Sequence, residues 1–253
     1  RLEMSPVVFV HVFACTHADW RLQTAHFSGA HPTFAPDLRG HGATHARPQD
    51  CSIETYGADI AALLDGKGLS GAVLVGHSMG CRVVLQAYLN APERVAALAL
   101  IDGSWLGGGD PGALERAARS AIAADGYVKF QRRFFDGMFL APSELAASIA
   151  ERAMRLPEAV GAGLFPRMVH WDAANMERAL AAVKVPMLVI QSTYLNAERK
   201  RVALNPGETT PWLDLVRLKA PQAQIEIVSG VGHFPQLEAP EQVNKLLSGL
   251  IDI

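Results

Sequence analysis

Cysteine is scarce in this sequence, which holds three cysteines among 253 residues. They lie far apart, at Cys15, Cys51 and Cys81, and no C-x-x-C pair is present. This count is too low for a disulfide framework, and the spacing does not match a structural zinc site. We therefore expect a protein of a reducing compartment, the cytoplasm, that needs no metal and no other cofactor.

The sequence also lacks an excess of charge. It is 49% hydrophobic and 19% charged, with a formal net charge of −2 at pH 7. No basic patch or charged tail is present, so nothing in the charge favours nucleic acid or an anionic membrane as a partner. No apolar run approaches the length of a transmembrane helix. The run 6–14 is interrupted by His11 and follows no basic cluster, so we do not expect a signal sequence there.

Apolar runs that read as strands are present at regular intervals. They are residues 6–10, 33–36, 72–75, 95–101, 187–190 and 224–228. Most are continuous rather than alternating, which is typical of strands buried on both faces of a parallel sheet. Helical patterns lie between them at 19–27, 52–64, 79–90, 211–219 and 240–250, with Asp19 and Ser52 as expected N-caps. The alternation predicts an α/β fold with a mostly parallel, doubly wound sheet.

The alternation of strand and helix stops after Ile101. Residues 103–183 show no convincing strand, but they contain helical stretches at 112–124, 127–135, 143–155 and 175–182, broken by glycine and proline. A long insertion in an α/β pattern usually forms a lid over the active site. We therefore expect a core built from residues 1–102 and 184–253, and a helical lid built from residues 103–183.

The stretch Gly76-His77-Ser78-Met79-Gly80 follows one predicted strand and opens the next predicted helix. A strand that turns at once into a helix brings backbone close to the neighbours of the serine, so a Cβ at either glycine would clash. On such a turn the serine stays exposed, and the first N–H groups of the helix point at an oxyanion formed beside it. We therefore predict that Ser78 is a nucleophile rather than part of an ordinary glycine-rich turn.

A serine hydroxyl needs a base to remove its proton, and the base needs a carboxylate that fixes its tautomer. His233 lies in Gly230-Val231-Gly232-His233-Phe234-Pro235, after the last predicted strand and before the last helix. In an open parallel sheet this position is at the carboxyl edge, where Ser78 also lies. We predict His233 as the base; the alternative is a loop histidine bonded to local backbone.

Four motifs, in this order along the chain, resemble those of the α/β-hydrolase fold. They are His11-Val12-Phe13 with Trp20, Asp37-Leu38-Arg39-Gly40-His41-Gly42, the Gly76–Gly80 elbow, and Gly232-His233-Phe234-Pro235. The resemblance covers nearly the whole chain and implies an oxyanion hole formed by the backbone N–H groups of Phe13 and Met79. It is more specific for the fold than for the reaction, because one scaffold hosts many chemistries.

The first departure from the family pattern is Val12, where members usually have glycine. A β-branched residue resists a positive φ, so we expect the oxyanion loop to take another shape. Hydroxynitrile lyases resemble this chain in replacing the glycine. They place a threonine there whose hydroxyl helps to bind substrate, which valine cannot do.

The second departure concerns the acid that orients the histidine. Family members usually carry an aspartate soon after the strand that corresponds to residues 187–190, yet no carboxylate follows here before Glu198. Some branches, which resemble haloalkane dehalogenases and cofactor-free dioxygenases, place the acid at the end of the strand that corresponds to residues 95–101. The resemblance therefore favours Asp102 as the acid and leaves Glu198 as the alternative.

Other polar residues near these motifs are expected to have structural roles. We expect His77 to pack under the elbow, and His11 and the 37–42 stretch to shape loops around the site. Arg39 is expected to tie the oxyanion loop to its neighbours by charge-assisted hydrogen bonds. His41 and His45 lack further ligands at fixed spacing, so we do not expect a metal site there.

The sequence predicts a cofactor-independent serine hydrolase that cleaves small to medium apolar carboxylic esters through an acyl-enzyme on Ser78. Candidates for the substrate pocket are apolar residues of the lid and of the oxyanion loop, namely Val12, Cys15, Trp105, Phe134, Met138 and Trp171. One alternative is a cofactor-free dioxygenase, or a C–C or hydroxynitrile lyase, with His233 as base. Another is a non-catalytic receptor for a small molecule. The oligomeric state stays open, a homodimer included.

Overall fold

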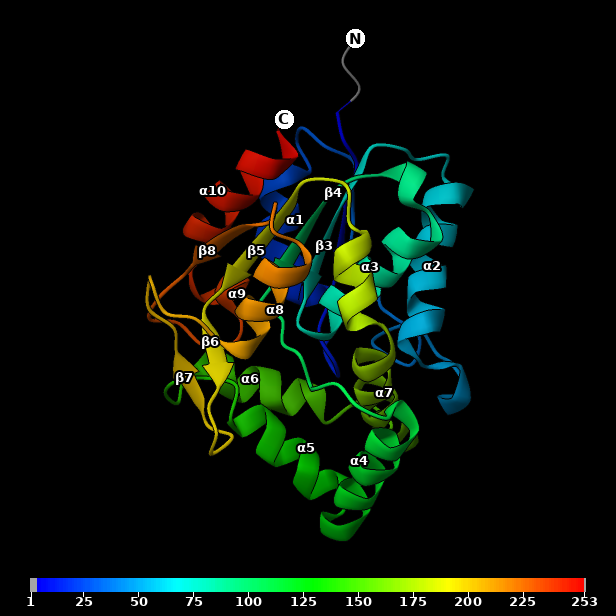
Figure 1. The fold of residues 1–253 in the computed structure, drawn as a ribbon, viewed down its shortest axis with the longest axis vertical. Coiled ribbons are helices and arrows are strands. Elements are labelled where there is room, and N and C mark those ends of the chain that lie inside the picture. Colours follow the sequence, from blue (N-terminus) through cyan, green and yellow to red (C-terminus); the bar gives the residue numbers. More distant parts are fainter. Residues whose placement is uncertain (1–3, 253) are drawn as a thin grey trace.

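The central element is a six-stranded parallel sheet in a computed structural model that describes residues 4–252. Its strand order is β2-β1-β3-β4-β5-β8, and every neighbouring pair is parallel (Figure 1). The strands are β1 (Val7–Val10), β2 (Thr33–Phe34), β3 (Ala72–His77), β4 (Val95–Ile101), β5 (Met187–Gln191) and β8 (Gln224–Ile227). All six predicted strands are present, and the predicted doubly wound parallel sheet is confirmed.

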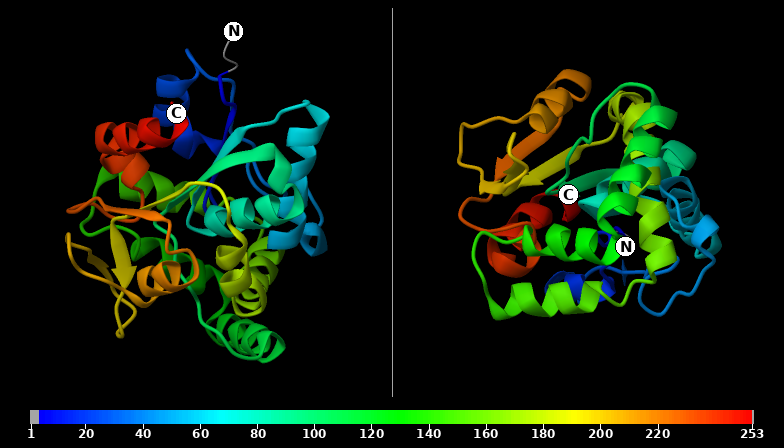
Figure 2. Two further views of the ribbon diagram at one scale, coloured as in Figure 1. Left: turned by 45° about the horizontal axis from the view of Figure 1, so that its top comes forward. Right: turned by 90° about the horizontal axis from the view of Figure 1, so that it is seen from below.

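Helices cover both faces of this sheet because successive residues of each strand point to opposite sides. Val8 and Val10 of β1 pack into a cluster with α2 (Ile53–Gly66), α3 (Met79–Asn90) and α8 (Pro211–Lys219). Val7 and Phe9 pack into a second cluster with α1 (Arg21–Phe27) and α10 (Pro240–Ile251). The continuous apolar character of β1 therefore reflects burial on both faces. Figure 2 shows the arrangement of the helices around the sheet from two further directions.

Four helices lie between β4 and β5, and residues 103–183 contain no strand. They are α4 (Pro111–Asp125), α5 (Tyr127–Asp136), α6 (Glu144–Ala153) and α7 (Glu158–Ala182). We call these residues the α4–α7 insertion; they lie beyond the carboxyl ends of the strands, in the lower part of Figure 1. The predicted helix 175–182 is only the last part of α7, which begins at Glu158 and continues through Pro166, so its predicted start was wrong. Burial of residues such as Leu164 and Met168 compensates for the poor helix propensity of proline.

Two local predictions about helix ends had different outcomes. Ser52 is confirmed as the N-cap of α2, since its Oγ accepts a hydrogen bond from the Thr55 N–H at 3.1 Å. Asp19 as an N-cap was wrong. It lies inside a 3-10 helix, η1 (His17–Trp20), which Thr16 caps, and its buried carboxylate pairs with Arg152 of α6. A buried ion pair between distant segments was not visible in the local pattern.

A short antiparallel ribbon follows β5 and was not predicted. It consists of β6 (Thr193–Leu195) and β7 (Arg201–Ala203), with Tyr194 opposite Val202. These strands are only three residues long, which is too short to give a strand pattern. The remaining elements are η2 (Pro48–Asp50), η3 (Pro92–Arg94) and α9 (Pro235–Glu238).

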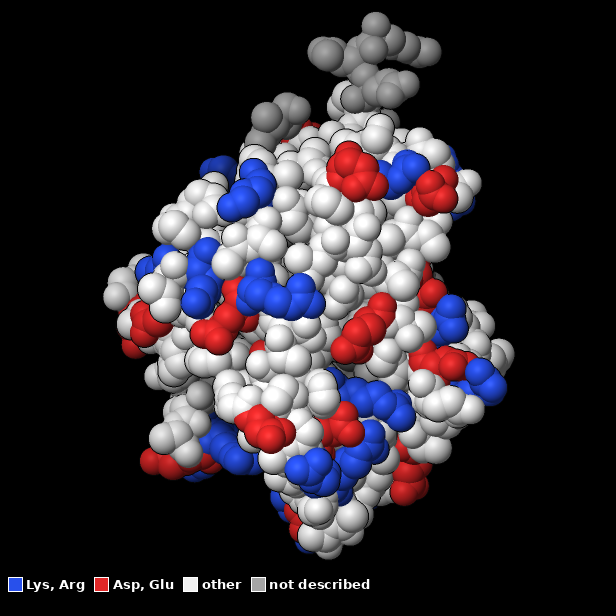
Figure 3. Space-filling view, turned by 45° about the vertical axis from the view of Figure 1, so that its right-hand side comes forward, with Lys and Arg blue, Asp and Glu red and all other residues white. Residues whose placement is uncertain are grey.

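Acidic and basic side chains lie interspersed among uncharged ones on the face drawn in Figure 3. This pattern agrees with the small net charge of the chain. Within residues 4–252, no helix combines the length and the apolar character needed to cross a bilayer.

Candidate active site

Ser78 lies on the tight turn between β3, which ends at His77, and α3, which begins at Met79. Its backbone has φ 53° and ψ −110°, a strained conformation for a residue with a Cβ. The Ser78 N–H donates to Ile101 O of β4 at 2.9 Å, which holds the turn on the sheet. The residue is neither buried nor fully exposed, so its hydroxyl is accessible at the carboxyl edge.

Both glycines of the elbow are required by close backbone contacts. A Cβ on Gly76 would lie 2.3 Å from Gly80 O, and a Cβ on Gly80 would lie 2.2 Å from Val10 O. These distances are shorter than van der Waals contact, and backbone atoms held in a sheet and a helix have little freedom to move.

We expect Gly80→Ala to lower the free energy of unfolding by about 3 kcal/mol, because the added methyl group forces α3 away from β1. The matched control is Gly249→Ala in α10, where a Cβ would meet no atom within 4 Å. That change should raise stability by up to about 1 kcal/mol, since alanine favours helix. Urea unfolding of both variants measures the difference. Equal stability of the two would contradict the close-approach argument.

Asp102 and His233 form a buried hydrogen-bonded pair. Asp102 directly follows β4, and His233 lies in the loop after β8, with His233 Nδ1 and Asp102 Oδ2 2.6 Å apart. The other carboxylate oxygen accepts from the backbone N–H groups of Ser192 at 2.8 Å and Thr193 at 3.0 Å, just after β5. The Thr193 hydroxyl donates to Oδ2 at 2.7 Å. Burial by itself raises the pKa of Asp102, but the His233 contact, the nearby Arg201 cation and the Ser192 N–H lower it to about 2.

His233 is held next to the elbow by its own backbone. Its carbonyl oxygen accepts a hydrogen bond from His77 Nε2 at 2.6 Å, and its N–H donates to Met138 O at 2.8 Å. Burial, followed by the nearby Arg201 cation, lowers the pKa of His233 to about 4, against the opposing effect of Asp102. The ring is therefore neutral at neutral pH, as a base must be.

His77 has the packing role that we expected. Its Nδ1 accepts from Gln236 Nε2 at 3.0 Å while Nε2 donates to the His233 carbonyl, so both nitrogens are occupied. Burial lowers the pKa of His77 to about 3, which keeps it neutral. It joins the elbow to the His233 loop.

Glu198, the alternative acid, does not contact His233. It is exposed in the turn between β6 and β7, where its Oε2 accepts from Asn196 Nδ2 at 3.3 Å. Asp102 is therefore the carboxylate that the structure places against the His233 ring.

The loop after β1 differs from the usual pattern in where its positive φ falls. Ala14, and not Val12, has the positive φ, of 63°, so the β-branched residue is not strained. His11 Nδ1 donates to Val12 O at 2.8 Å, and His41 Nε2 accepts from the Ala14 N–H at 3.0 Å. Burial lowers the pKa of both histidines, to about 3 for His11 and about 4 for His41, so both brace the loop as neutral rings.

The two backbone N–H groups predicted to form the oxyanion hole belong to Phe13 and Met79. The Phe13 N–H finds no hydrogen-bond acceptor within residues 4–252. Met79 is the first residue of α3, where an N–H group has no intrahelical acceptor.

Arg39 does not bind the oxyanion loop as expected. Its guanidinium instead forms two hydrogen bonds to Asp59 of α2, at 2.7 and 2.9 Å, because that carboxylate lies closer.

The pocket candidates fall into two groups. Val12, Cys15, Met138 and Trp171 are buried, whereas Trp105 and Phe134 are partly exposed. Trp171 holds α7 on α3, because its Nε1 donates to Gln86 Oε1 at 2.8 Å. Burial raises the pKa of the Cys15 thiol, so this side chain is uncharged. Phe134 of α5 packs against the oxyanion loop, with its ring 6.0 Å from the Phe13 ring.

An aromatic cluster joins the insertion to the oxyanion loop. Phe13 also lies 6.0 Å from Phe165 of α7, and Phe130 of α5 lies 5.0 Å from Phe165. Phe130, Phe134 and Phe165 are each partly exposed. Apolar surface is therefore present next to the Phe13 N–H.

A buried ion pair beneath the elbow was missed by the sequence reasoning. Arg82 of α3 donates to both oxygens of Asp172 on α7, at 2.8 Å each, and both side chains are enclosed. Arg82 also donates to Ser78 O at 3.2 Å, and the Leu106 N–H donates to Asp172 at 2.8 Å. The pair links the insertion to the backbone of the elbow. No sequence signal joins residues ninety positions apart.

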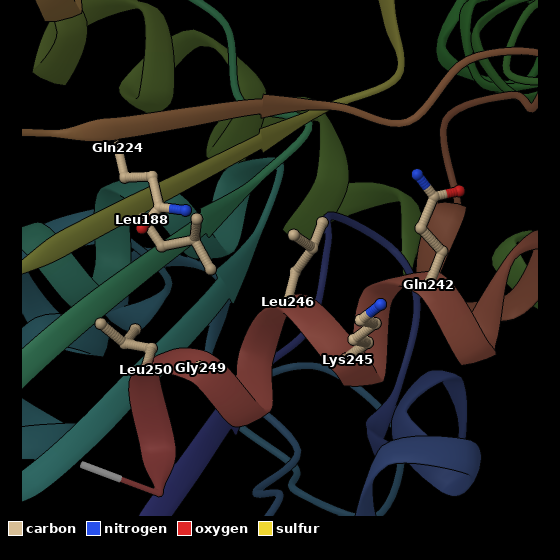
Figure 4. Close-up of a pocket in the computed structure, with 7 residues that line it drawn as sticks. All are labelled: Leu188, Gln224, Gln242, Lys245, Leu246, Gly249 and Leu250. Carbon is tan, nitrogen blue, oxygen red and sulfur yellow. The ribbon is translucent and has the colours of Figure 1, made fainter.

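A surface hollow with a volume of about 490 Å³ lies away from these residues. Figure 4 shows its lining residues, which come from α10 and from β5 and β8: Leu188, Gln224, Gln242, Lys245, Leu246, Gly249 and Leu250. None of these residues contacts Ser78, Asp102 or His233 through a hydrogen bond. Residues 4–252 also contain no group of three or more His, Cys, Asp or Glu side chains arranged to bind a metal ion.

Comparison with known proteins gives a consistent fold assignment. A family model described as "Alpha/beta hydrolase family" matches residues 7–246. The chain is 26% identical over 241 residues to the dihydrolipoyllysine-residue acetyltransferase component of the acetoin cleaving system of Pseudomonas putida, covering 95% of this chain and 62% of that protein. It is 35% identical over 131 residues to an epoxide hydrolase of Caballeronia sordidicola, covering 50% of this chain and 40% of that protein. The chain thus spans less than two thirds of the length of these relatives.

Among solved structures, a thermophilic esterase from Thermogutta terrifontis superposes with a TM-score of 0.80. The match covers 99% of this chain and 90% of the esterase, at 23% sequence identity. At this identity the likeness establishes the shared fold and leaves the reaction to be argued from the site.

Proposed function

The chain belongs to the alpha/beta hydrolase family, and we propose that it is a cofactor-independent serine hydrolase that cleaves small to medium apolar carboxylic esters. The observation that supports this most strongly is the common position of three groups. Ser78 on the strained elbow, and Asp102 with His233 at 2.6 Å, all follow sheet strands at the carboxyl edge. That is the arrangement a serine nucleophile needs.

In the proposed reaction Ser78 Oγ attacks the ester carbonyl while His233 Nε2 takes the hydroxyl proton. Asp102 holds the proton on Nδ1 and stabilises the imidazolium that forms. The N–H groups of Phe13 and Met79 donate to the oxyanion. His233 then returns the proton to the departing alcohol, which leaves an acyl-enzyme on Ser78. Water, deprotonated by His233, releases the carboxylic acid and regenerates the serine.

The aromatic cluster supports an apolar substrate. Phe134 and Phe165 lie against Phe13, whose N–H is the proposed oxyanion donor. An acyl or alcohol part of hydrocarbon character would therefore bury its surface on these rings. A relative that is named an epoxide hydrolase and a neighbour that is named an esterase are consistent with a hydrolytic reaction.

A fluorophosphonate probe tests whether Ser78 is activated. We expect stoichiometric labelling, with the mass increase mapped to the peptide that contains Ser78, because the probe reacts with serines whose proton a base removes. Heat-denatured protein is the control and should not be labelled. A native protein that resists the probe would be a non-catalytic receptor instead, and the proposed hydrolase would be wrong.

A second candidate rests on the position of Asp102 at the end of β4, which also suits a cofactor-free dioxygenase or a lyase. In such a reaction His233 removes a substrate proton and Ser78 only anchors the substrate. Oxygen consumption with an N-heteroaromatic substrate, or cleavage of a cyanohydrin, would favour this candidate. Neither activity is expected if esters are turned over.

A further inference from the structure

Arg201 brings a buried cation to the His233–Asp102 pair. It lies on β7, and its side chain is only 9% exposed. The Arg201 Nη1 atom lies 2.9 Å from Thr193 Oγ1, 3.1 Å from His233 Nδ1 and 3.8 Å from Asp102 Oδ2. A serine, histidine and aspartate suffice for the proposed reaction, so the presence of this cation as a fourth group needs its own explanation.

The positions of the protons follow from the contacts of Asp102. A separation of 2.6 Å between an ionised carboxylate and His233 Nδ1 requires a proton on Nδ1, donated to the carboxylate. A protonated Nδ1 has no lone pair, so it cannot accept a hydrogen bond from Arg201 Nη1. Arg201 Nη1 donates instead to Thr193 Oγ1, and the Thr193 hydroxyl donates to Asp102 Oδ2. Arg201 thus acts on the pair through Thr193 and through its charge.

Arg201 is also attached to the α4–α7 insertion. Its Nε donates to Gly137 O at 3.2 Å, in the turn that follows α5. The next residue, Met138, accepts the hydrogen bond from the His233 N–H, and a Cβ on Gly232 would lie 2.9 Å from Met138 O. The Phe139 and Phe234 rings stack 5.4 Å apart. The backbone of the turn 137–139 therefore accepts hydrogen bonds from both His233 and Arg201.

We propose that Arg201 is a positioning residue that fixes Asp102 through Thr193 and opposes the protonation of His233, so that the base stays neutral in mildly acidic solution. This rests on the proposed function, because it assigns Arg201 to the same His233 base. A cation close to the ring disfavours the imidazolium, while the Thr193 bridge keeps the carboxylate oriented.

The other charged or titratable groups around His233 do not replace this effect. Asp102 favours the imidazolium, and His77 of β3 is neutral. Arg82 of α3 acts in the same direction as Arg201 but is a smaller cause and is paired with Asp172. Glu238 of α9 lies near Gly232, and burial raises its pKa. Arg201 is therefore the cation in direct contact with the ring, and it shares the Asp102 carboxylate with His233.

The direction of the pH effect follows from these causes. Burial and then Arg201 lower the pKa of His233 to about 4. Removing the Arg201 charge leaves burial in place and raises the pKa towards the ordinary value of about 6.5. Since kcat/KM falls when the free base is protonated, the acid limb of its pH profile must move to higher pH.

We expect Arg201→Gln to move the acid limb of kcat/KM for a p-nitrophenyl ester upward by about one pH unit. Arg201→Lys keeps a cation and should move it by less than half as much. The matched control is Arg199→Gln, an exposed arginine of the same ribbon, which should leave the profile unchanged. An arginine that only stabilised the ribbon would lower activity at every pH without moving the limb, and that result would overturn the proposal.

Titration of the His233 ring by NMR tests the same effect without turnover. In protein labelled at histidine nitrogen, the His233 signals, assigned by their loss in His233→Asn, should titrate at a higher pH in Arg201→Gln than in the wild type, because burial is unchanged and the cation is gone. Titration at the same pH in both proteins would overturn the proposal. Because this measurement needs no ester hydrolysis, an absence of esterase activity would count against the proposed function and not against the role of Arg201.

Discussion

Ser78→Ala lowers kcat/KM for p-nitrophenyl ester hydrolysis by roughly five to six orders of magnitude, if Ser78 is the nucleophile as proposed. The loss is large because the acyl-enzyme can no longer form, while the oxyanion donors and the substrate pocket remain. Steady-state kinetics at pH 7 to 8 measures it, with a protein concentration high enough to detect the residual rate.

The matched control for Ser78→Ala is Ser70→Ala. Ser70 precedes β3, whereas Ser78 follows it, and Ser70 is exposed and forms no hydrogen bond to Ser78, Asp102 or His233. Its kcat/KM should equal that of the wild type. A loss of less than tenfold in Ser78→Ala would show that the serine only binds substrate, as in the dioxygenase or lyase candidate. Ser78→Ala leaves the backbone strain of the elbow unchanged, because alanine has the same Cβ at φ 53°.

The sequence was informative wherever structure depends on neighbours along the chain. Apolar runs predicted all six strands of the sheet, and the runs are continuous in β1, β4 and most of β3 and β5 because these inner strands are buried on both faces, whereas the edge strands β2 and β8 are partly exposed and contain polar residues. The elbow was also readable, since a Cβ on Gly76 would clash within the five-residue motif, although Gly80 is required by Val10 of β1. Helix α7 was only partly predicted, because Gly161, Gly163 and Pro166 disfavour helix locally while packing against α3 and the core stabilises it.

Contacts between distant residues could not be read in the same way. Arg201 contacts His233, which is 32 residues away in the sequence, and Arg82 forms an ion pair with Asp172, which is 90 residues away. No sequence motif links either pair. For the same reason, the sequence could not decide between Asp102 and Glu198 as the acid that orients His233. Both carboxylates follow a strand of the sheet, and only the folded chain puts one of them 2.6 Å from the His233 ring and leaves the other exposed.

The acid assignment leads to the second large effect. Asp102→Asn should lower kcat by about 10⁴-fold for the same esters, with little change in KM. An asparagine amide that replaces the carboxylate can turn its N–H₂ group towards His233 Nδ1 and donate to it. The ring would then carry its proton on Nε2, where it could no longer accept the proton of Ser78.

The surroundings of Asp102 make the carboxylate difficult to replace. Its two oxygens accept from Ser192, Thr193 and His233, so all the neighbours are donors arranged for a negative charge. The amide would place an N–H₂ group against at least one of these donors, which leaves a buried polar group unsatisfied. We therefore also expect a loss of stability of about 2 kcal/mol, measured by urea unfolding.

Glu198→Gln is the matched control for Asp102→Asn, because it makes the same chemical change in an exposed carboxylate. Its kinetics should equal those of the wild type. The opposite pattern, with Glu198→Gln inactive and Asp102→Asn active, would require the ribbon to rearrange so that Glu198 reaches His233. Arg201 opposes that movement, since its hydrogen bonds to Thr193 and Gly137 tie β7 both to the start of β6 and to the insertion. The same cation that opposes protonation of His233 therefore also hinders Glu198 from replacing Asp102 against its ring.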